Sequence, residues 1–205
     1  GAGGLTTILE WDSSSWTAGG SLPFATIYTT GGGTQTAAIT MGGFRTSPPA
    51  SSASIRTYNG SSWSVEGTSL PSSRDSQRQY GESSSSQNVV GGWTAGSIQN
   101  KHENWNGTTV TTLTGYPTAL SEIGTAGTVT AGLCFTGDGY PAPKSLVTST
   151  WDGSAWTAAG DYPTAITSVG GSGSTTAGLS FGGYPGATAT NHYDLAASTQ
   201  TLTTS

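Results

Sequence analysis

Charge of either sign is scarce in this sequence, and positive charge is the scarcer. Only 8% of the 205 residues are Asp, Glu, Lys or Arg, where about 25% is usual. Six Lys and Arg stand against eleven Asp and Glu, which gives a formal net charge of −5. Binding to a phosphate backbone needs a basic patch, and so does attraction to an anionic membrane. We therefore expect neither nucleic acid nor a membrane as a partner.

Cysteine and long apolar runs are also missing. Cys134 is the only cysteine, which excludes an internal disulfide and predicts a small buried side chain. No run of 18 apolar residues occurs, so membrane insertion is not expected. The sequence begins Gly1-Ala2-Gly3-Gly4, without Met or a signal peptide, which is typical of a processed or partial chain.

Small and aromatic residues are abundant instead. The chain has 32 Gly, seven Trp and eight Tyr. A chain poor in large aliphatic residues can be disordered, but disorder normally accompanies high net charge and few aromatic residues. The composition therefore favours a folded β protein with layers of small residues and aromatic anchors.

An aromatic residue followed by Asp or Asn and a third residue, usually small, recurs along the chain at intervals of 42 to 47 residues. The copies begin at Trp11, Tyr58, Trp105, Trp151 and Tyr193. A second Trp follows five residues later in three of them, at Trp16, Trp63 and Trp156. A period of this length with glycine-rich turns is typical of propeller blades.

A glycine doublet followed by an aromatic residue recurs between these copies. The doublets are Gly42-Gly43, Gly91-Gly92 and Gly182-Gly183. The third copy departs from the pattern, because the segment 136–140, Thr-Gly-Asp-Gly-Tyr, carries two extra residues. Dipeptides such as Asn59-Gly60 predict two-residue type I′ turns between adjacent strands. The small residues before each doublet predict a strand buried on both faces.

These motifs resemble the kelch repeat, whose units combine a glycine doublet with a later pair of aromatic residues. The resemblance covers about residues 5–201 and implies an all-β fold, a β-propeller of kelch-like four-stranded blades. The aromatic pairs stand closer together here than in typical kelch units, which indicates a shorter hairpin. The repeat sequence is rich in Ser, Thr and Gly, and in this it is also similar to repeat proteins of aquatic bacteriophage virions and bacterial surfaces.

The repeats predict a single propeller domain over residues 1–205. Its units are a partial one at about 5–18 and four full ones at 22–67, 69–114, 116–159 and 162–203. Two strands from the partial unit and sixteen from the others fit neither four nor five blades of four strands. We expect a five-bladed ring with an incomplete blade, and a four-bladed ring or a piece of a longer array are the alternatives.

The sequence has few residues suited to catalysis or metal binding. His102 and His192 are the only histidines, and neither has a metal-ligand spacing. The recurring Asp12, Asp152 and Asp194 sit at hairpin turns of different units, where a carboxylate bonds the local backbone. We therefore predict no catalytic residue, no metal, no cofactor and no enzymatic activity.

Two sets of residues are candidates for ligand binding. In the second unit Arg74, Arg78 and Tyr80 fall where an innermost strand would line a central channel. One aromatic residue per unit follows the glycine doublets, and flat rings suit the C–H faces of sugars. This second set predicts a ring of equivalent pockets formed by Phe44, Trp93, Tyr140 and Tyr184.

The sequence thus favours a non-enzymatic structural or adhesion module of a virion appendage or cell surface. Such a module would display the propeller to other copies, to virion or surface proteins, or to glycans, in an extracellular setting. A lectin-like carbohydrate-binding propeller is the alternative, and a fragment of a propeller enzyme is a third hypothesis. Fold alone does not decide among them.

Overall fold

The computed structural model describes residues 4–186, 190–196 and 199–204, with the backbone alone for 194–196 and 199–204. The expected turn carboxylate of Asp194 therefore lies outside the described side chains. The described residues form an all-β structure with no helix. It follows that no helix in this part of the chain is long and apolar enough to cross a membrane.

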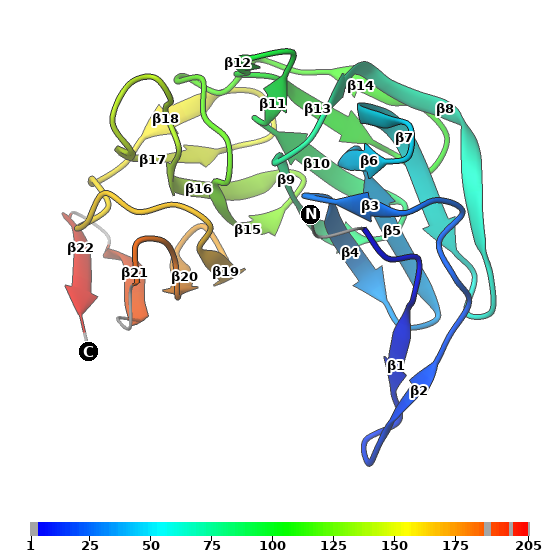
Figure 1. Ribbon diagram of the computed structural model, residues 1–205. Coiled ribbons are helices and arrows are strands. Elements are labelled where there is room, and N and C mark those ends of the chain that lie inside the picture. The colour runs from blue at the N-terminus through cyan, green and yellow to red at the C-terminus, as the bar shows by residue number, and fades with distance from the viewer. Residues whose placement is uncertain (1–3, 187–189, 197–198, 205) are drawn as a thin grey trace.

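Four antiparallel sheets, each with four strands paired in chain order, follow one another along the chain (Figure 1). The first sheet has β4 (Thr30–Thr34), β5 (Ala37–Met41), β7 (Pro49–Tyr58) and β8 (Trp63–Arg74). The second has β9 (Arg78–Ser83), β10 (Ser86–Val90), β13 (His102–Trp105) and β14 (Val110–Thr112). The third has β15 (Gly124–Thr128), β16 (Ala131–Gly137), β17 (Ser145–Trp151) and β18 (Trp156–Ala158). The fourth has β19 (Gly170–Gly173), β20 (Ala177–Phe181), β21 (Thr190–Ala196) and β22 (Thr199–Thr204).

Shorter strands accompany these sheets. The pairs are β1 (Leu9–Trp11) with β2 (Trp16–Ala18), β3 (Thr26–Ile27) with β6 (Phe44–Thr46), and β11 (Trp93–Thr94) with β12 (Ser97–Ile98). Strand β6 also pairs with the start of β7, so β3 and β6 extend the first sheet. The hairpin β1–β2 projects from the first sheet at one end of the molecule (Figure 1).

The turns between third and fourth strands are longer than the sequence predicted. Tyr58 pairs with Trp63, which leaves a loop of four residues in place of a two-residue type I′ turn. The Asn59 side-chain oxygen accepts bonds of 3.0 and 2.9 Å from the amides of Ser61 and Ser62, and only Gly60 has positive φ. The side chain of Asn59 thus closes the turn, which removes the need for positive φ at both central residues.

The four sheets stack face to face through small residues and apolar side chains. First strands lie side by side, β4 beside β9, β9 beside β15, and β15 beside β19. Buried clusters join consecutive sheets, for example Ile39 and Met41 with Trp105 between the first and second. Leu133 and Phe135 likewise pack with Tyr193 between the third and fourth. Because each cluster draws on two sheets, no sheet buries its apolar residues alone.

A ladder of backbone hydrogen bonds links equivalent residues of the four units. Tyr28, Ser76, Glu122 and Ser168 all have positive φ. The Ser76 amide donates to the Tyr28 carbonyl at 2.9 Å, and the Glu122 amide donates to the Ser76 carbonyl at 2.8 Å. The Ser168 amide donates to the Glu122 carbonyl at 3.0 Å. Each unit therefore contacts the next in the same way.

Candidate functional site

At the end of each second strand, two consecutive residues with positive φ direct the chain toward one end of the sheets. The pairs are Gly42-Gly43, Gly91-Gly92, Thr136-Gly137 and Gly182-Gly183. A Cβ atom on Gly91 would lie 2.3 Å from the Leu120 carbonyl oxygen, so a larger residue does not fit there. The aromatic residues that follow these pairs are thereby placed near the backbone ladder.

Two of these aromatic rings meet across the boundary between the second and third units. The rings of Trp93 and Tyr140 have centroids 5.9 Å apart and are tilted by 53°. Trp93 is held by paired backbone bonds with Asp75, of 2.7 and 3.0 Å. Tyr140 is 62% exposed, and its amide donates to a carboxylate oxygen of Asp138 at 3.3 Å. The two rings form one apolar wall that is open to solvent.

The rings border a surface cleft of about 400 Å³, which we call the aromatic cleft. Its lining consists of Ser76, Trp93, Ser121, Glu122, Asp138 and Tyr140. Backbone bonds between Ser121 and Asp138, of 2.8 and 3.0 Å, fix the third-unit side of the cleft. The site therefore combines aromatic faces with hydroxyls and two carboxyl groups.

Glu122 is held in place by neighbours from the fourth unit. Its side chain accepts hydrogen bonds from the hydroxyls of Thr167, at 2.5 Å, and Ser168. Burial by itself would raise the pKa of Glu122, but these hydrogen bonds and the charges of Arg78 and Lys144 lower it on balance. The carboxylate is therefore ionised at neutral pH and fixed in orientation.

The structure does not arrange the four aromatic residues as a ring of equivalent pockets. Phe44 is half-buried in β6, where its backbone pairs with β3 and β7. Tyr184 is exposed and lies under the Lys144 ammonium group, 5.3 Å from the ring centroid. Among the described rings of this set, only Trp93 and Tyr140 lie close enough to act on one ligand.

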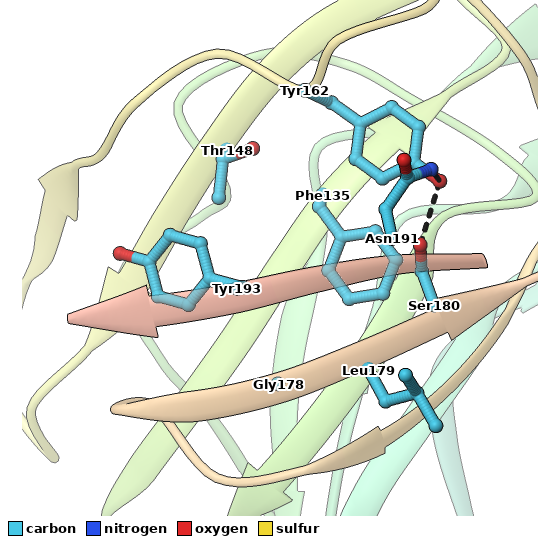
Figure 2. A pocket seen from close by; sticks show the side chains of 8 residues that line it. All are labelled: Phe135, Thr148, Tyr162, Gly178, Leu179, Ser180, Asn191 and Tyr193. Carbon is cyan, nitrogen blue, oxygen red and sulfur yellow. Dashed lines mark hydrogen bonds between the residues drawn. The ribbon is translucent and has the colours of Figure 1, made fainter. Parts of the chain in front are cut away.

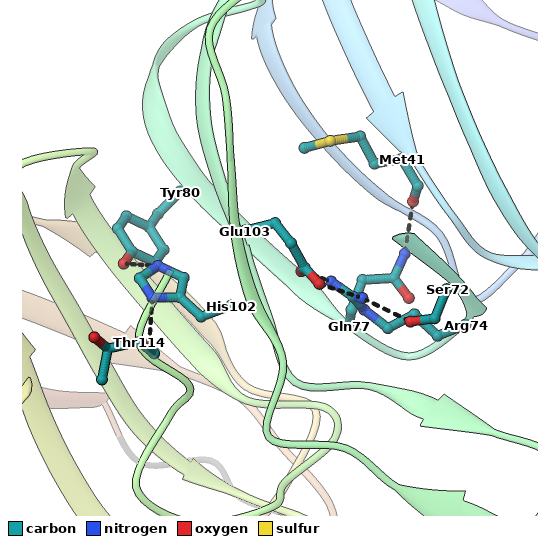
Figure 3. Close-up of polar contacts among 8 residues, drawn as sticks. All are labelled: Met41, Ser72, Arg74, Gln77, Tyr80, His102, Glu103 and Thr114. Carbon is teal, nitrogen blue, oxygen red and sulfur yellow. Dashed lines mark hydrogen bonds and ion pairs between the residues drawn. The ribbon is translucent and has the colours of Figure 1, made fainter. Parts of the chain in front are cut away.

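Arg74 does not lie on a first strand, contrary to the sequence-based expectation. It ends β8 in the first sheet, is fully buried, and forms a two-pronged ion pair with Glu103, in which the Nη1–Oε1 distance is 3.0 Å (Figure 3). A guanidinium paired in this way inside the protein is not available to a ligand in a channel. The position of Arg74 is thus a correction, and its role is in packing.

Arg78 and Tyr80 do lie on a first strand, β9, as expected. Arg78 is half-buried, and burial lowers its pKa although the nearby Glu122 charge opposes the shift. The Tyr80 ring is buried, and its hydroxyl is 3.1 Å from His102 Nε2 (Figure 3). The same hydroxyl accepts a hydrogen bond of 3.2 Å from Asn88. Burial also raises the pKa of Tyr80 well above its ordinary value.

The first strands border a second opening, a groove of about 250 Å³. Glycine backbone from β4, β15 and β19 forms much of its wall, and Tyr80, Gln79 and Gln87 are its larger side chains. The Gln79 amide is engaged by Gln87 at 3.2 Å. Compared with the aromatic cleft, this groove offers few groups that converge on a ligand.

A small cavity of about 10 Å³ lies between the third and fourth sheets. The Phe135 and Tyr162 rings stack beside it at 5.6 Å, and a hydrogen bond of 2.6 Å joins the hydroxyls of Tyr162 and Ser180 (Figure 2). A cavity of this size has room for about one water molecule. It belongs to the core and not to a ligand site.

Acidic side chains at the hairpin loops bond to their own backbone. One oxygen of Asp12 accepts from the amides of Ser14 and Ser15, and one oxygen of Asp152 accepts from the amides of Ser154 and Ala155. Among the described residues no group of three or more His, Cys, Asp or Glu is arranged to hold a metal ion.

No protein-family model matches the chain, and the comparison with curated proteins finds no significant relative. The site must therefore be interpreted from its own chemistry. Sequence reasoning named Trp93 and Tyr140 but missed Glu122 as part of the same site. The sequence signal for the meeting of the two rings was the insertion in the third unit. Because of it, Asp138 makes the backbone bridge to Ser121, and Tyr140 lies two residues farther along the chain.

Proposed function

We propose that this chain is a kelch-like array of propeller blades that serves as a non-catalytic adhesion or display module on a virion appendage or a cell surface. We propose further that its aromatic cleft binds a glycan. The module would thus join the structural and the lectin-like interpretations of the sequence. The low charge and the small polar side chains are consistent with a surface protein whose contacts are to sugars or other proteins.

The architecture supports the propeller part of this proposal. Four sheets with adjacent first strands and one repeated backbone ladder are what blades around an axis require. The hairpin β1–β2 carries Trp11 and Trp16 in the register of the outer strands of a blade, as Trp151 and Trp156 do. We propose four blades and an outer half blade. A five-bladed ring would need the hairpin to meet the fourth sheet, and the two lie at opposite ends of the arc (Figure 1).

The observation that carries the glycan proposal is the meeting of Trp93 and Tyr140 at 5.9 Å on the surface. Such rings present apolar faces to sugar C–H groups, while nearby polar side chains orient the hydroxyls. Ser76, Ser121, Glu122 and Asp138 supply those polar groups. Because both charged residues of the lining are acidic, we propose neutral glycans and not acidic ones.

Two carboxyl groups beside aromatic rings are also what a glycosidase uses. In such enzymes one carboxyl acts as a general acid, and its pKa is raised. Glu122 has a lowered pKa and is bonded to Thr167 and Ser168. Glu122 is therefore not suited to be the general acid, and release of reducing sugar is the measurement that separates binding from hydrolysis.

A glycan array probed with the wild-type chain and three variants tests the proposal. We expect Trp93→Ala and Tyr140→Ala to weaken binding of neutral oligosaccharides by at least about tenfold, which corresponds to about 1.4 kcal/mol. Tyr184→Ala is the matched control, because Tyr184 is an equally exposed ring outside the cleft.

Three results would count against the proposal. One is an array with no bound glycan. Another is an equal loss in Tyr184→Ala and Trp93→Ala. The third is release of reducing sugar from a bound oligosaccharide that stops in Asp138→Asn, since this would indicate hydrolysis.

A further inference from the structure

The outer face of the fourth sheet exposes an apolar side chain, that of Phe181. In the other three sheets the residue at the equivalent position is buried. Met41, Val90 and Phe135 pair with the first residue of the first strand in their sheets, as Phe181 does. Met41 and Val90 are 0% exposed and Phe135 is 4% exposed, whereas Phe181 is 48% exposed. Phe135 is covered by Val169 and Tyr193 of the next unit. No described residue plays that part for Phe181, so this face lacks the cover that the other three have.

The opposite end of the molecule carries a complementary apolar surface. The hairpin β1–β2 exposes Trp11 by 45% and Trp16 by 65%. Glu10, on the other face of β1, accepts a hydrogen bond from the Tyr58 hydroxyl of the first sheet. Trp11 and Trp16 border an opening of about 280 Å³ that Tyr58 and Trp63 of the first sheet also line, so both rings remain accessible to a partner.

Inside the chain, residues equivalent to Trp11 cover residues equivalent to Phe181. Trp105 packs on Met41 of the preceding sheet. Tyr193 packs with Phe135 of the preceding sheet. Trp105 ends its third strand before the hairpin loop, as Trp11 ends β1. Tyr193 is the repeat equivalent of Trp11 on the third strand of the fourth sheet, although β21 continues to Ala196. The hairpin and the fourth sheet therefore each expose one side of a contact that consecutive sheets make inside the chain.

We propose that copies of this chain associate head to tail, the hairpin β1–β2 of one copy covering the Phe181 face of another. The hairpin and the fourth sheet lie at the two ends of the arc of sheets, separated by its open side (Figure 1), so they do not meet within one molecule. Two different, complementary patches make a heterologous interface, which extends an array or closes a ring of copies. A second copy is the occupant because its hairpin carries an aromatic residue at the position that makes this contact inside the chain. The aromatic cleft takes no part, so this association and glycan binding stand or fall separately.

Sedimentation velocity of the full chain over roughly a hundredfold range of concentration tests the association. We expect dimers and larger species that increase with concentration. Phe181→Ser and Trp11→Ser should each weaken association by at least about tenfold. Val65→Ser is the matched control, because Val65 is equally exposed but lies on β8, away from both surfaces.

Mixing the two variants gives the sharper test. The Trp11→Ser chain keeps its Phe181 face and the Phe181→Ser chain keeps its hairpin, so the mixture should form dimers at concentrations where each variant alone is monomeric. Both side chains are exposed in the single copy, so folding should be unchanged, which far-ultraviolet circular dichroism checks. A wild-type chain that stays monomeric at every concentration, association unaffected by Phe181→Ser, or a mixture that fails to dimerise would each overturn the proposal.

Discussion

Buried polar pairs differ from one unit to the next, although the backbone around them repeats. In the second unit Arg74 and Glu103 form a fully buried ion pair. In the first unit the corresponding places hold Thr26 and Arg56, and the buried Arg56 guanidinium donates to the Thr26 hydroxyl at 2.9 Å. A buried charge is tolerated only when partners replace its water. In both units the two positions are therefore occupied by side chains that bond to each other.

Replacing one partner of the ion pair should be far more harmful than replacing both. Glu103→Gln leaves the Arg74 charge buried without a carboxylate, and we expect a loss of about 3–5 kcal/mol in the free energy of unfolding. The double variant Arg74→Leu with Glu103→Ser copies Leu120 and Ser149 of the third unit and should recover most of that loss. Urea unfolding of the three chains measures this, and a double variant as unstable as Glu103→Gln would contradict the matched-pair account.

His102 should make stability depend on pH. Its burial, together with the Arg74 charge, lowers its pKa from 6.5 to about 4, although the bond to the Thr114 carbonyl opposes the shift. Between these values the unfolded chain binds a proton that the folded chain excludes, so stability is full above pH 6.5 and falls as the pH decreases toward 4. The loss at the acid end is up to about 3 kcal/mol.

The His102→Gln variant isolates this contribution, because it leaves the carboxylates that also titrate in acid unchanged. Urea unfolding at several pH values should give a flatter dependence for the variant than for the wild type. Parallel curves for the two chains would exclude His102 as the source.

At the scale of strands and turns, the sequence was informative about the elements and less so about their ends. Doublets such as Gly91-Gly92 and aromatic residues such as Trp105 stand at the ends of strands, as their residue types imply. The loop at Asn59 could not be predicted in detail, since its length depends on side-chain bonds to Ser61 and Ser62. Strand β8 also runs to Arg74, past the expected end of its unit at 67.

Glycines in the second strands allow neighbouring sheets to approach, which gives a prediction for β16. A Cβ atom on Gly132 would lie 2.4 Å from the Tyr80 ring, and that ring is buried and hydrogen-bonded to His102. Gly132→Ala should therefore cost about 1–3 kcal/mol by overpacking. In Gly67→Ala the new methyl group meets no atom within 4 Å, so this variant should be neutral or slightly stabilising. Equal unfolding midpoints for the two variants would contradict the close approach of the sheets.

At the scale of the whole molecule, the repeated units were visible in the sequence, but the meeting of particular rings was not. Trp93 and Tyr140 come from different units, and their distance depends on how one sheet is rotated against the next. Glu122 could not be recognised from the repeats, because the residues at the same position of the other units are Tyr28, Ser76 and Ser168, which share no chemistry with it. The cleft is therefore a consequence of the stacking and of the insertion at 136–140, where the third unit departs from the others.

Isothermal titration with the neutral oligosaccharide that binds best on the array tests the central claim most directly, because it counts sites. The single meeting of Trp93 with Tyr140 predicts one ligand per chain and loss of the heat signal in Trp93→Ala. Several equal sites per chain would restore the ring of equivalent pockets and contradict the account. Undiminished binding in Trp93→Ala would contradict it as well.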